Sequence, residues 1–218
     1  MSLPALAAEP GVFLTHHSDR EFELTADPSA THWRVAGVVI ENDRFGKPVP
    51  GHRTEVRSRW TRENLYILFS CKYKDLYLKP NPVMDQETNK LWEWDVAEVF
   101  VGADFDNILR YREFQMSPQG EWVDLDIDKS KPRFAEGWVW NSGMKVKARI
   151  DHDAKMWFGE MMIPIRSIDT RPPKAGNEMR INLYHIQGPE PRNYLAWQAV
   201  HNPSYHTPER FGRLRLVE

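Results

Sequence analysis

The chain has 218 residues, with 29 lysines and arginines against 31 aspartates and glutamates, and a formal net charge of -2 at pH 7. With 41% of residues hydrophobic and 28% charged, the composition is typical of a globular protein with a packed core. Balanced charge without a basic stripe argues against nucleic acid as a partner. The single cysteine, Cys71, excludes an intrachain disulfide and any multi-cysteine metal site. No apolar run reaches the length of about 18 residues that a membrane helix needs, so we expect no membrane partner.

The domain organisation is expected to be simple. Met1, Ser2 and Leu3 resemble a remnant of an expression vector, and we expect an N-terminal extension over residues 1–19. No linker or internal repeat divides the rest, which predicts one domain over residues 20–218.

Alternation of polar and apolar residues, rather than helical periodicity, dominates the chain. In residues 53–60, for example, Thr54, Val56, Ser58 and Trp60 share one face of a half-buried strand. We expect strands, in chain order, over residues 35–40, 53–60, 65–69, 96–101, 111–116, 122–127, 144–150, 157–163, 181–186, 194–199 and 212–216. About ten short strands separated by Gly, Pro and Asn predict an all-β fold, a single antiparallel β-sandwich with little helix.

Nine tryptophans are an unusual number for a chain of this length. Trp60, Trp122 and Trp157 stand in predicted strands and are expected to be core residues. Trp92 and Trp94 are two residues apart at a junction between a loop and a strand, where they would share one face. An indole beside carboxylate and amide groups suits a sugar ring, so these two are candidates for a binding surface as well as for the core.

Acidic residues provide candidates for a metal site. Asp124, Asp126 and Asp128 would lie on one face of a strand, but the residues that follow do not match an EF-hand loop. A solvated strand face and a structural calcium site both remain open for these three. Asp104 and Asp106 in a loop are a second, weaker calcium candidate, and calcium is the only cofactor that the sequence suggests.

No strong catalytic motif is present, and we expect no catalytic residues. Asp95 and Glu98 are three residues apart and would point to opposite faces of a strand, so they cannot form a glycosidase pair. His201 and His206 are expected to be loop histidines that make hydrogen bonds rather than metal ligands. Cys71 is expected to be an inert core thiol.

Several motifs together resemble the family 9 carbohydrate-binding modules. They are Arg59-Trp-Thr-Arg-Glu-Asn-Leu-Tyr66, Trp92-Glu-Trp-Asp-Val-Ala-Glu-Val-Phe100, Phe114-Gln-Met-Ser-Pro-Gln-Gly120, Trp157-Phe-Gly-Glu-Met-Met-Ile-Pro164, Asn182 and Pro208-Glu-Arg-Phe-Gly212. The likeness covers nearly the whole chain from about residue 20. It implies a β-sandwich that binds plant-type β-linked polysaccharide or oligosaccharide, such as xylan or cellulose, without cleaving it. It also implies association with glycoside hydrolases in polysaccharide catabolism outside the cytoplasm, in a secreted or periplasmic protein.

The resemblance also implies roles for individual residues. Trp92 would be one stacking ring, and Tyr205 stands where the second ring, usually Trp, is found. Further ligand-binding positions implied by the motifs are Glu98 as a carboxylate for sugar hydroxyls, Asn202 as an amide contact, Gln115 in place of an Arg, Tyr184 in place of a Gln, and Trp94 as an added aromatic. The changes at Tyr205 and Gln115 alter the expected ligand more than the expected fold.

Two other functions remain open at this stage. The sandwich could be an interaction domain whose Trp92, Trp94 and Tyr205 cover a protein partner. Less favoured is a glycoside hydrolase acting on O-glycosyl bonds, with Glu98 paired to a distant acid such as Asp95 or Asp124.

Overall fold

The computed structural model describes residues 11–132 and 138–218, and these form an all-β fold. The expected vector remnant, Met1 to Leu3, lies outside the described residues. Within the described part, no helix is long and apolar enough to cross a membrane. The strands are β1 (Val12–His17), β2 (Val38–Ile40), β3 (Thr54–Trp60), β4 (Asn64–Lys72), β5 (Val96–Gly102), β6 (Arg110–Met116), β7 (Trp122–Asp128), β8 (Lys145–Asp151), β9 (Met156–Pro164), β10 (Glu178–Gln187), β11 (Asn193–Ala196) and β12 (Gly212–Val217). Four short 3-10 helices accompany them, η1 (Thr31–Trp33), η2 (Leu91–Glu93), η3 (Ile165–Ser167) and η4 (Pro208–Arg210).

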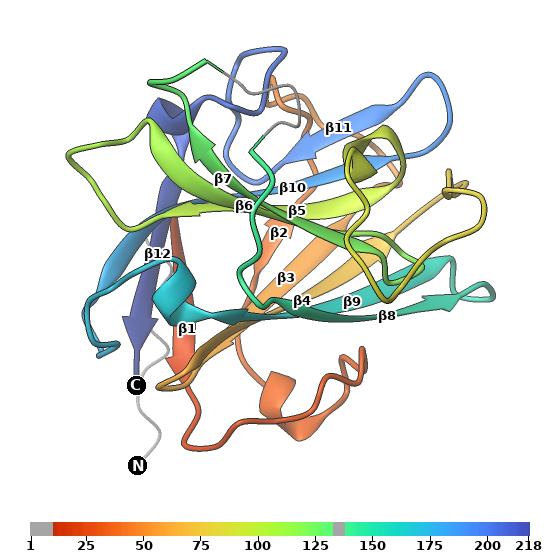
Figure 1. Ribbon diagram of the computed structural model, residues 1–218. Helices are drawn as coiled ribbons and strands as arrows, with labels where there is room; N and C mark the ends of the chain where they lie inside the picture. The colour runs from red at the N-terminus through yellow and green to blue at the C-terminus, as the bar shows by residue number, and fades with distance from the viewer. Residues whose placement is uncertain (1–10, 133–137) are drawn as a thin grey trace.

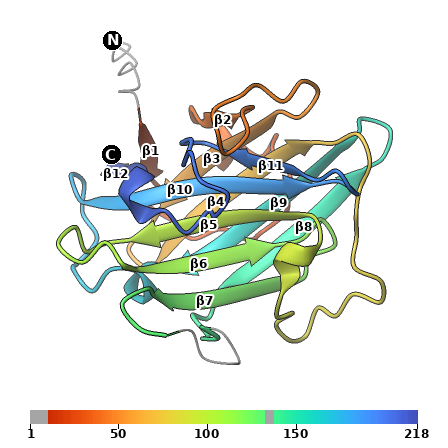
Figure 2. The same cartoon turned by 90° about the horizontal axis from the view of Figure 1, so that it is seen from above.

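The strands form two layers that share one continuous hydrogen-bonded order, β7-β6-β5-β10-β12-β1-β3-β4-β9-β8. Figure 1 shows β5, β6, β7 and β10 crossing over β3, β4, β8 and β9, while β12 and β1 connect the layers at one side. Seen from above, β10, β5, β6 and β7 run side by side as the first layer (Figure 2). The prediction of a β-sandwich is therefore confirmed.

Most strand pairs are antiparallel, as predicted, but β1 pairs in parallel with both β12 and β3. This strand was not among those expected from the sequence, and it falls in the segment expected to be an N-terminal extension. Val12, Phe13 and Thr15 are buried in it, whereas the last two residues are histidines, so the apolar signal is short. The pairing places β1 in the middle of the strand order rather than at an edge.

Burial follows the predicted faces of the strands. In β3, Thr54, Val56, Ser58 and Trp60 are buried and the residues between them are half-exposed. In contrast, β4 is buried on both faces because it lies between β3 and β9 and is covered by the segment around Trp33.

The main core fills the space between the layers. The alternation of β5, β6 and β10 directs one set of side chains into it, among them Val99, Phe114 and Leu183. Trp60 and Trp157 are buried in this core and Trp122 packs against it, as expected from the sequence.

A buried carboxylate fixes the segment before β2 to the layer formed by β3, β4, β8 and β9. Glu160 on β9 is fully buried, and its two oxygens accept hydrogen bonds from Trp33 Nε1 and from the Thr25 backbone N–H, both at 2.6 Å. Because both donors come from the segment before β2, this side chain holds that segment over the outer face of β4 and β9.

Replacing Glu160 by alanine is expected to lower the free energy of unfolding by about 2 kcal/mol, since the buried Trp33 N–H would lose its acceptor. Urea unfolding followed by circular dichroism measures the loss. Glu63→Ala removes the same group at an exposed turn position and is the matched control. Equal stabilities for the two variants would show that Glu160 does not hold the segment.

Candidate functional site

The outer face of the first layer forms a second cluster of side chains, distinct from the main core. Glu98 on β5 lies opposite Gln115 on β6 and opposite Tyr184 on β10, so these three occupy neighbouring positions on one face. The segment that precedes β12 covers this face, and Tyr205 packs in the cluster.

A cavity of about 170 Å³ opens in this cluster, and we call it the outer cavity. Its walls combine aromatic rings with two carboxylates, one guanidinium and one imidazole. The lining residues are Arg44, Trp92, Glu98, Phe100, Glu113, Leu125, Trp138, Ile186, Tyr194, Pro203, Tyr205 and His206.

Two of the aromatic residues expected to stack on a ligand, Trp92 and Tyr205, both line the outer cavity. Trp92 is half-buried and belongs to η2, just before β5. Tyr205 is 8% exposed and stacks on Tyr184, with ring centroids 3.9 Å apart and planes 14° apart. Its hydroxyl donates to the Leu195 carbonyl oxygen at 3.0 Å, which fixes the orientation of the ring.

Glu98 is the most unusual polar group in the cavity wall. Its side chain is 2% exposed, and its Oε2 atom has no hydrogen-bond partner among the described residues. Burial, and secondarily the neighbouring charge of Glu113, raise the pKa of Glu98 well above its ordinary value. A buried acceptor of this kind costs free energy unless a ligand or water supplies a donor.

Glu113 is a second buried carboxylate in the wall, 3% exposed. Gln115 Nε2 donates to its Oε1, and His206 Nε2 lies 3.8 Å from its Oε2. His206 is in turn 2.8 Å from the Tyr111 hydroxyl through Nδ1. Sequence reasoning missed Glu113, although it alternates with Gln115 on a predicted strand and must share its face.

Four residues implied by the resemblance do not line the outer cavity. Gln115 and Tyr184 are fully buried behind its wall, where Tyr184 accepts a hydrogen bond from Asn182 Nδ2 and donates to the Tyr205 carbonyl oxygen. Asn202 is exposed, and its Oδ1 accepts from the Ser204 N–H.

Trp94 is the fourth of these, and unlike Trp92 it does not line the outer cavity. Its ring packs on Tyr77 with centroids 4.6 Å apart. The two indoles were expected to share a face as strand residues, but residues 91–93 form the turn η2 and strand geometry starts only afterwards. Arg192 donates to the carbonyl oxygens of both tryptophans and holds this junction.

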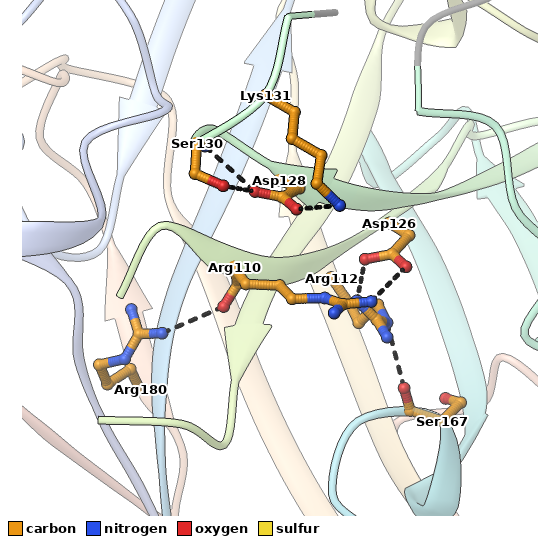
Figure 3. Close-up of polar contacts among 8 residues, drawn as sticks. All are labelled: Arg110, Arg112, Asp126, Asp128, Ser130, Lys131, Ser167 and Arg180. Carbon is orange, nitrogen blue, oxygen red and sulfur yellow. Dashed lines mark hydrogen bonds and ion pairs between the residues drawn. The ribbon is translucent and has the colours of Figure 1, made fainter. Parts of the chain in front are cut away.

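Four of the five acidic residues proposed for calcium have side-chain partners, and Figure 3 shows those of Asp126 and Asp128. On β7, Asp126 pairs with Arg110 and Arg112, and Asp128 with Lys131. On the same face of β7, Asp124 accepts hydrogen bonds from the backbone N–H and the hydroxyl of Ser142. In the loop before β6, Asp104 accepts hydrogen bonds from the backbone N–H groups of Asp106 and Asn107. Within residues 11–132 and 138–218, no three ligating side chains converge as a metal ion would need.

The acids considered as partners of Glu98 in hydrolysis also lie elsewhere. Asp95 accepts the backbone N–H groups of Tyr77 and Gly188, and burial raises its pKa to about 6. Neither Asp95 nor Asp124 lines the outer cavity. Cys71 is fully buried in β4, and burial raises its pKa well above the ordinary value, as an inert thiol requires.

Comparison with solved structures supports the same architecture. A protein from Bacteroides uniformis that has been proposed to bind carbohydrate superposes with a TM-score of 0.74 at 16% identity, covering 94% of this chain and 98% of that one. A family 9 carbohydrate-binding module from Caldicellulosiruptor kristjanssonii in complex with glucose gives 0.64 at 13% identity, covering 93% and 95%. The structure with cellotriose of a family 9 module from the same organism gives 0.66 at 12% identity, covering 94% and 93%.

Sequence comparison gives distant relatives and a family. An extracellular protein of Arthroderma benhamiae is 23% identical over 191 residues, covering 79% of this chain and 84% of the relative. Endo-1,4-beta-xylanase A of Thermotoga neapolitana is 22% identical over 165 residues, which is 75% of this chain but only 14% of the xylanase. The profile described as carbohydrate family 9 binding domain-like matches residues 31–218. The chain therefore belongs to the family 9 carbohydrate-binding modules.

Proposed function

We propose that the outer cavity binds carbohydrate without cleaving it, with Trp92 and Tyr205 as its aromatic walls. Glu98 supports this proposal most directly, because this residue lines the cavity and its buried Oε2 atom needs a donor such as a sugar hydroxyl. Indole and phenol rings offer the apolar faces on which a pyranose packs. The combination of a buried acceptor with aromatic walls is the usual composition of a small-ligand site.

The size of the cavity favours one sugar ring. The outer cavity has a volume of about 170 Å³. This is below the range of roughly 300 to 1,000 Å³ that drug-sized ligands occupy. We therefore infer that the terminal unit of a chain, or a free monosaccharide, enters the cavity while further units remain outside.

The structural neighbours support a β-linked glucan as the ligand, since two of them are complexes with glucose and cellotriose. The similarity to part of a xylanase extends the proposal to xylan-type chains. It also supports a role in polysaccharide breakdown, and together with the extracellular relative it supports a location outside the cytoplasm.

The residues behind and beside the wall have supporting roles in this proposal. Gln115 orients Glu113, and Tyr184 provides the stacking base for Tyr205. Asn202 shapes the turn that leads into Tyr205, and in this proposal it contacts sugar units outside the cavity. Trp94 shapes the junction before β5 rather than the cavity.

Trp92→Ala is expected to weaken the binding of cellotriose by about 1 to 3 kcal/mol, which corresponds to about 5- to 150-fold in Kd. The loss follows from removing one aromatic wall of the cavity. Isothermal titration calorimetry with glucose, cellotriose and xylotriose measures it without depending on tryptophan emission.

Trp94→Ala is the matched control, because it removes the same ring two residues away and outside the cavity. Its affinity for cellotriose should equal that of the native chain. If Trp92→Ala also binds as tightly as the native chain, the outer cavity is not the binding site. If the native chain binds none of the three sugars, the proposed function is wrong.

A further inference from the structure

The outer cavity contains two buried carboxyl groups, which is more than a neutral sugar needs. Glu98 and Glu113 are both more than nine-tenths buried and both line it. They come from neighbouring strands, and because Glu98 lies opposite Gln115, Glu113 is its diagonal neighbour. Diagonal positions on adjacent strands are about 7 Å apart, so one sugar ring can contact both carboxylates.

Among the described residues, no positive group around the cavity forms an ion pair or hydrogen bond with Glu98 Oε2. Arg44 lines the cavity, but its guanidinium lies over the Tyr194 ring, 4.3 Å from the centroid, and no ion pair among the described residues joins it to Glu98. Arg192 directs its guanidinium to the carbonyl oxygens of Trp92 and Trp94, and its charge lowers the pKa of Glu98 by less than burial and Glu113 raise it.

His206 is the remaining basic group in the wall. Its Nε2 atom lies 3.8 Å from Glu113 and its Nδ1 atom contacts the Tyr111 hydroxyl, so its ring is directed toward Glu113. Glu98 Oε2 thus keeps no hydrogen-bond partner among the described residues. An occupant that carries a positive charge would supply what the wall lacks.

A protonated amine combines a positive charge with several hydrogen-bond donors, and the environment of Glu98 favours both. It presents three N–H donors, whereas a hydroxyl presents one. Hydrogen bonds between ionised partners are also roughly twice as strong as neutral ones. Burial and the mutual repulsion of the two carboxyl groups raise the pKa of Glu98, and a cation bound between them would relieve that repulsion.

We propose that the outer cavity prefers an amino sugar of the hexosamine class, with its ammonium group between Glu98 and Glu113. This inference rests on the proposed function and specifies its ligand. It makes Glu113 a specificity-determining residue that the sequence motifs do not indicate. The same two carboxylates would repel an acidic sugar such as a uronate.

The test is calorimetric titration of the native chain at neutral pH with glucosamine, glucose, N-acetylglucosamine and glucuronate. Glucosamine is expected to bind about tenfold more tightly than glucose, which is the gain for converting a neutral hydrogen bond into a charge-assisted one. N-acetylglucosamine is expected to show no such gain because acetylation removes the charge. Glucuronate is expected to bind most weakly.

The variant Glu113→Gln should reduce the ratio of glucosamine to glucose affinity toward one, because it removes the second negative charge. Asp106→Asn makes the same change of charge in an exposed loop and should leave the ratio as in the native chain. Circular dichroism checks whether both variants fold. If Glu113→Gln does not fold, the four titrations of the native chain still decide whether the cavity prefers an amine.

The outcomes separate this inference from the proposed function. If glucose binds and glucosamine binds no more tightly, the amine preference is wrong and the sugar site stands. If glucosamine and N-acetylglucosamine bind equally, the amine charge is not recognised and the inference is likewise overturned. If none of these four sugars binds, this inference fails, and the titrations with cellotriose and xylotriose decide whether the proposed function fails with it.

Discussion

Replacing Trp157 by alanine is expected to lower the free energy of unfolding by about 3 to 5 kcal/mol, the range for removing a large aromatic side chain from a core. Trp157 on β9 is fully buried between the two layers and contacts His185 edge to face, with ring centroids 5.7 Å apart. Gly159 makes room for it: a Cβ atom there would lie 2.9 Å from the indole and 2.1 Å from Met116. The neighbours are packed around the indole, so alanine would leave a cavity that they fill only in part.

Trp157→Phe is the matched variant, since it keeps an aromatic ring. It also removes an indole N–H that has no hydrogen-bond partner among the described residues. Trp157→Phe should therefore lower the free energy of unfolding clearly less than Trp157→Ala does. Urea unfolding followed by far-ultraviolet circular dichroism measures both, and equal losses would show that the ring does not contribute through packing.

Acid is expected to destabilise the fold through His185. This side chain on β10 is fully buried between the layers, and burial, with the nearby His52, lowers its pKa from 6.5 to about 3. Its stabilising contribution is complete above the unfolded-state pKa of 6.5, where the imidazole is neutral in both states. Below pH 6.5 the unfolded chain binds a proton that the folded chain excludes, and each pH unit costs about 1.4 kcal/mol until the folded pKa is reached. At pH 4.5 the loss is about 3 kcal/mol, and near pH 3 it is about 4 kcal/mol.

His185→Asn isolates this effect, because other buried groups act in the opposite direction. The raised pKa values of Asp95, Glu98 and Glu87 mean that these carboxyls bind protons more readily in the folded chain and favour it as the pH falls. The difference between the unfolding free energies of the native chain and the variant should shrink between pH 6.5 and pH 3. A difference that does not change with pH would contradict the assignment.

The fold was largely predictable because its strands alternate along the chain. The faces of β3 and the two-sided burial of β4 follow directly from residues 53–60 and 65–69. The parallel pairings of β1 could not be predicted, because alternation defines the faces of a strand but not its neighbours.

The cavity wall was predictable only where it comes from strands or motifs. Glu98 and Trp92 belong to one motif, and Glu113 follows from alternation with Gln115. Arg44 and His206 come from loops before and after distant strands, and nothing local in the sequence brings a loop residue to a particular cavity.

The parallel pair β1 and β12 has a consequence for how the chain folds. Val12 lies opposite Arg213, so the contact that joins the two layers links the two ends of the described sequence. Closing so long a loop is entropically costly and slows folding in proteins dominated by distant contacts. During synthesis, β1 emerges from the ribosome long before β12 and cannot complete its pairing until the last strand is free. The layers can therefore close only after translation of this region is complete, and until then the unpaired edge of β1 is open to contacts with other chains.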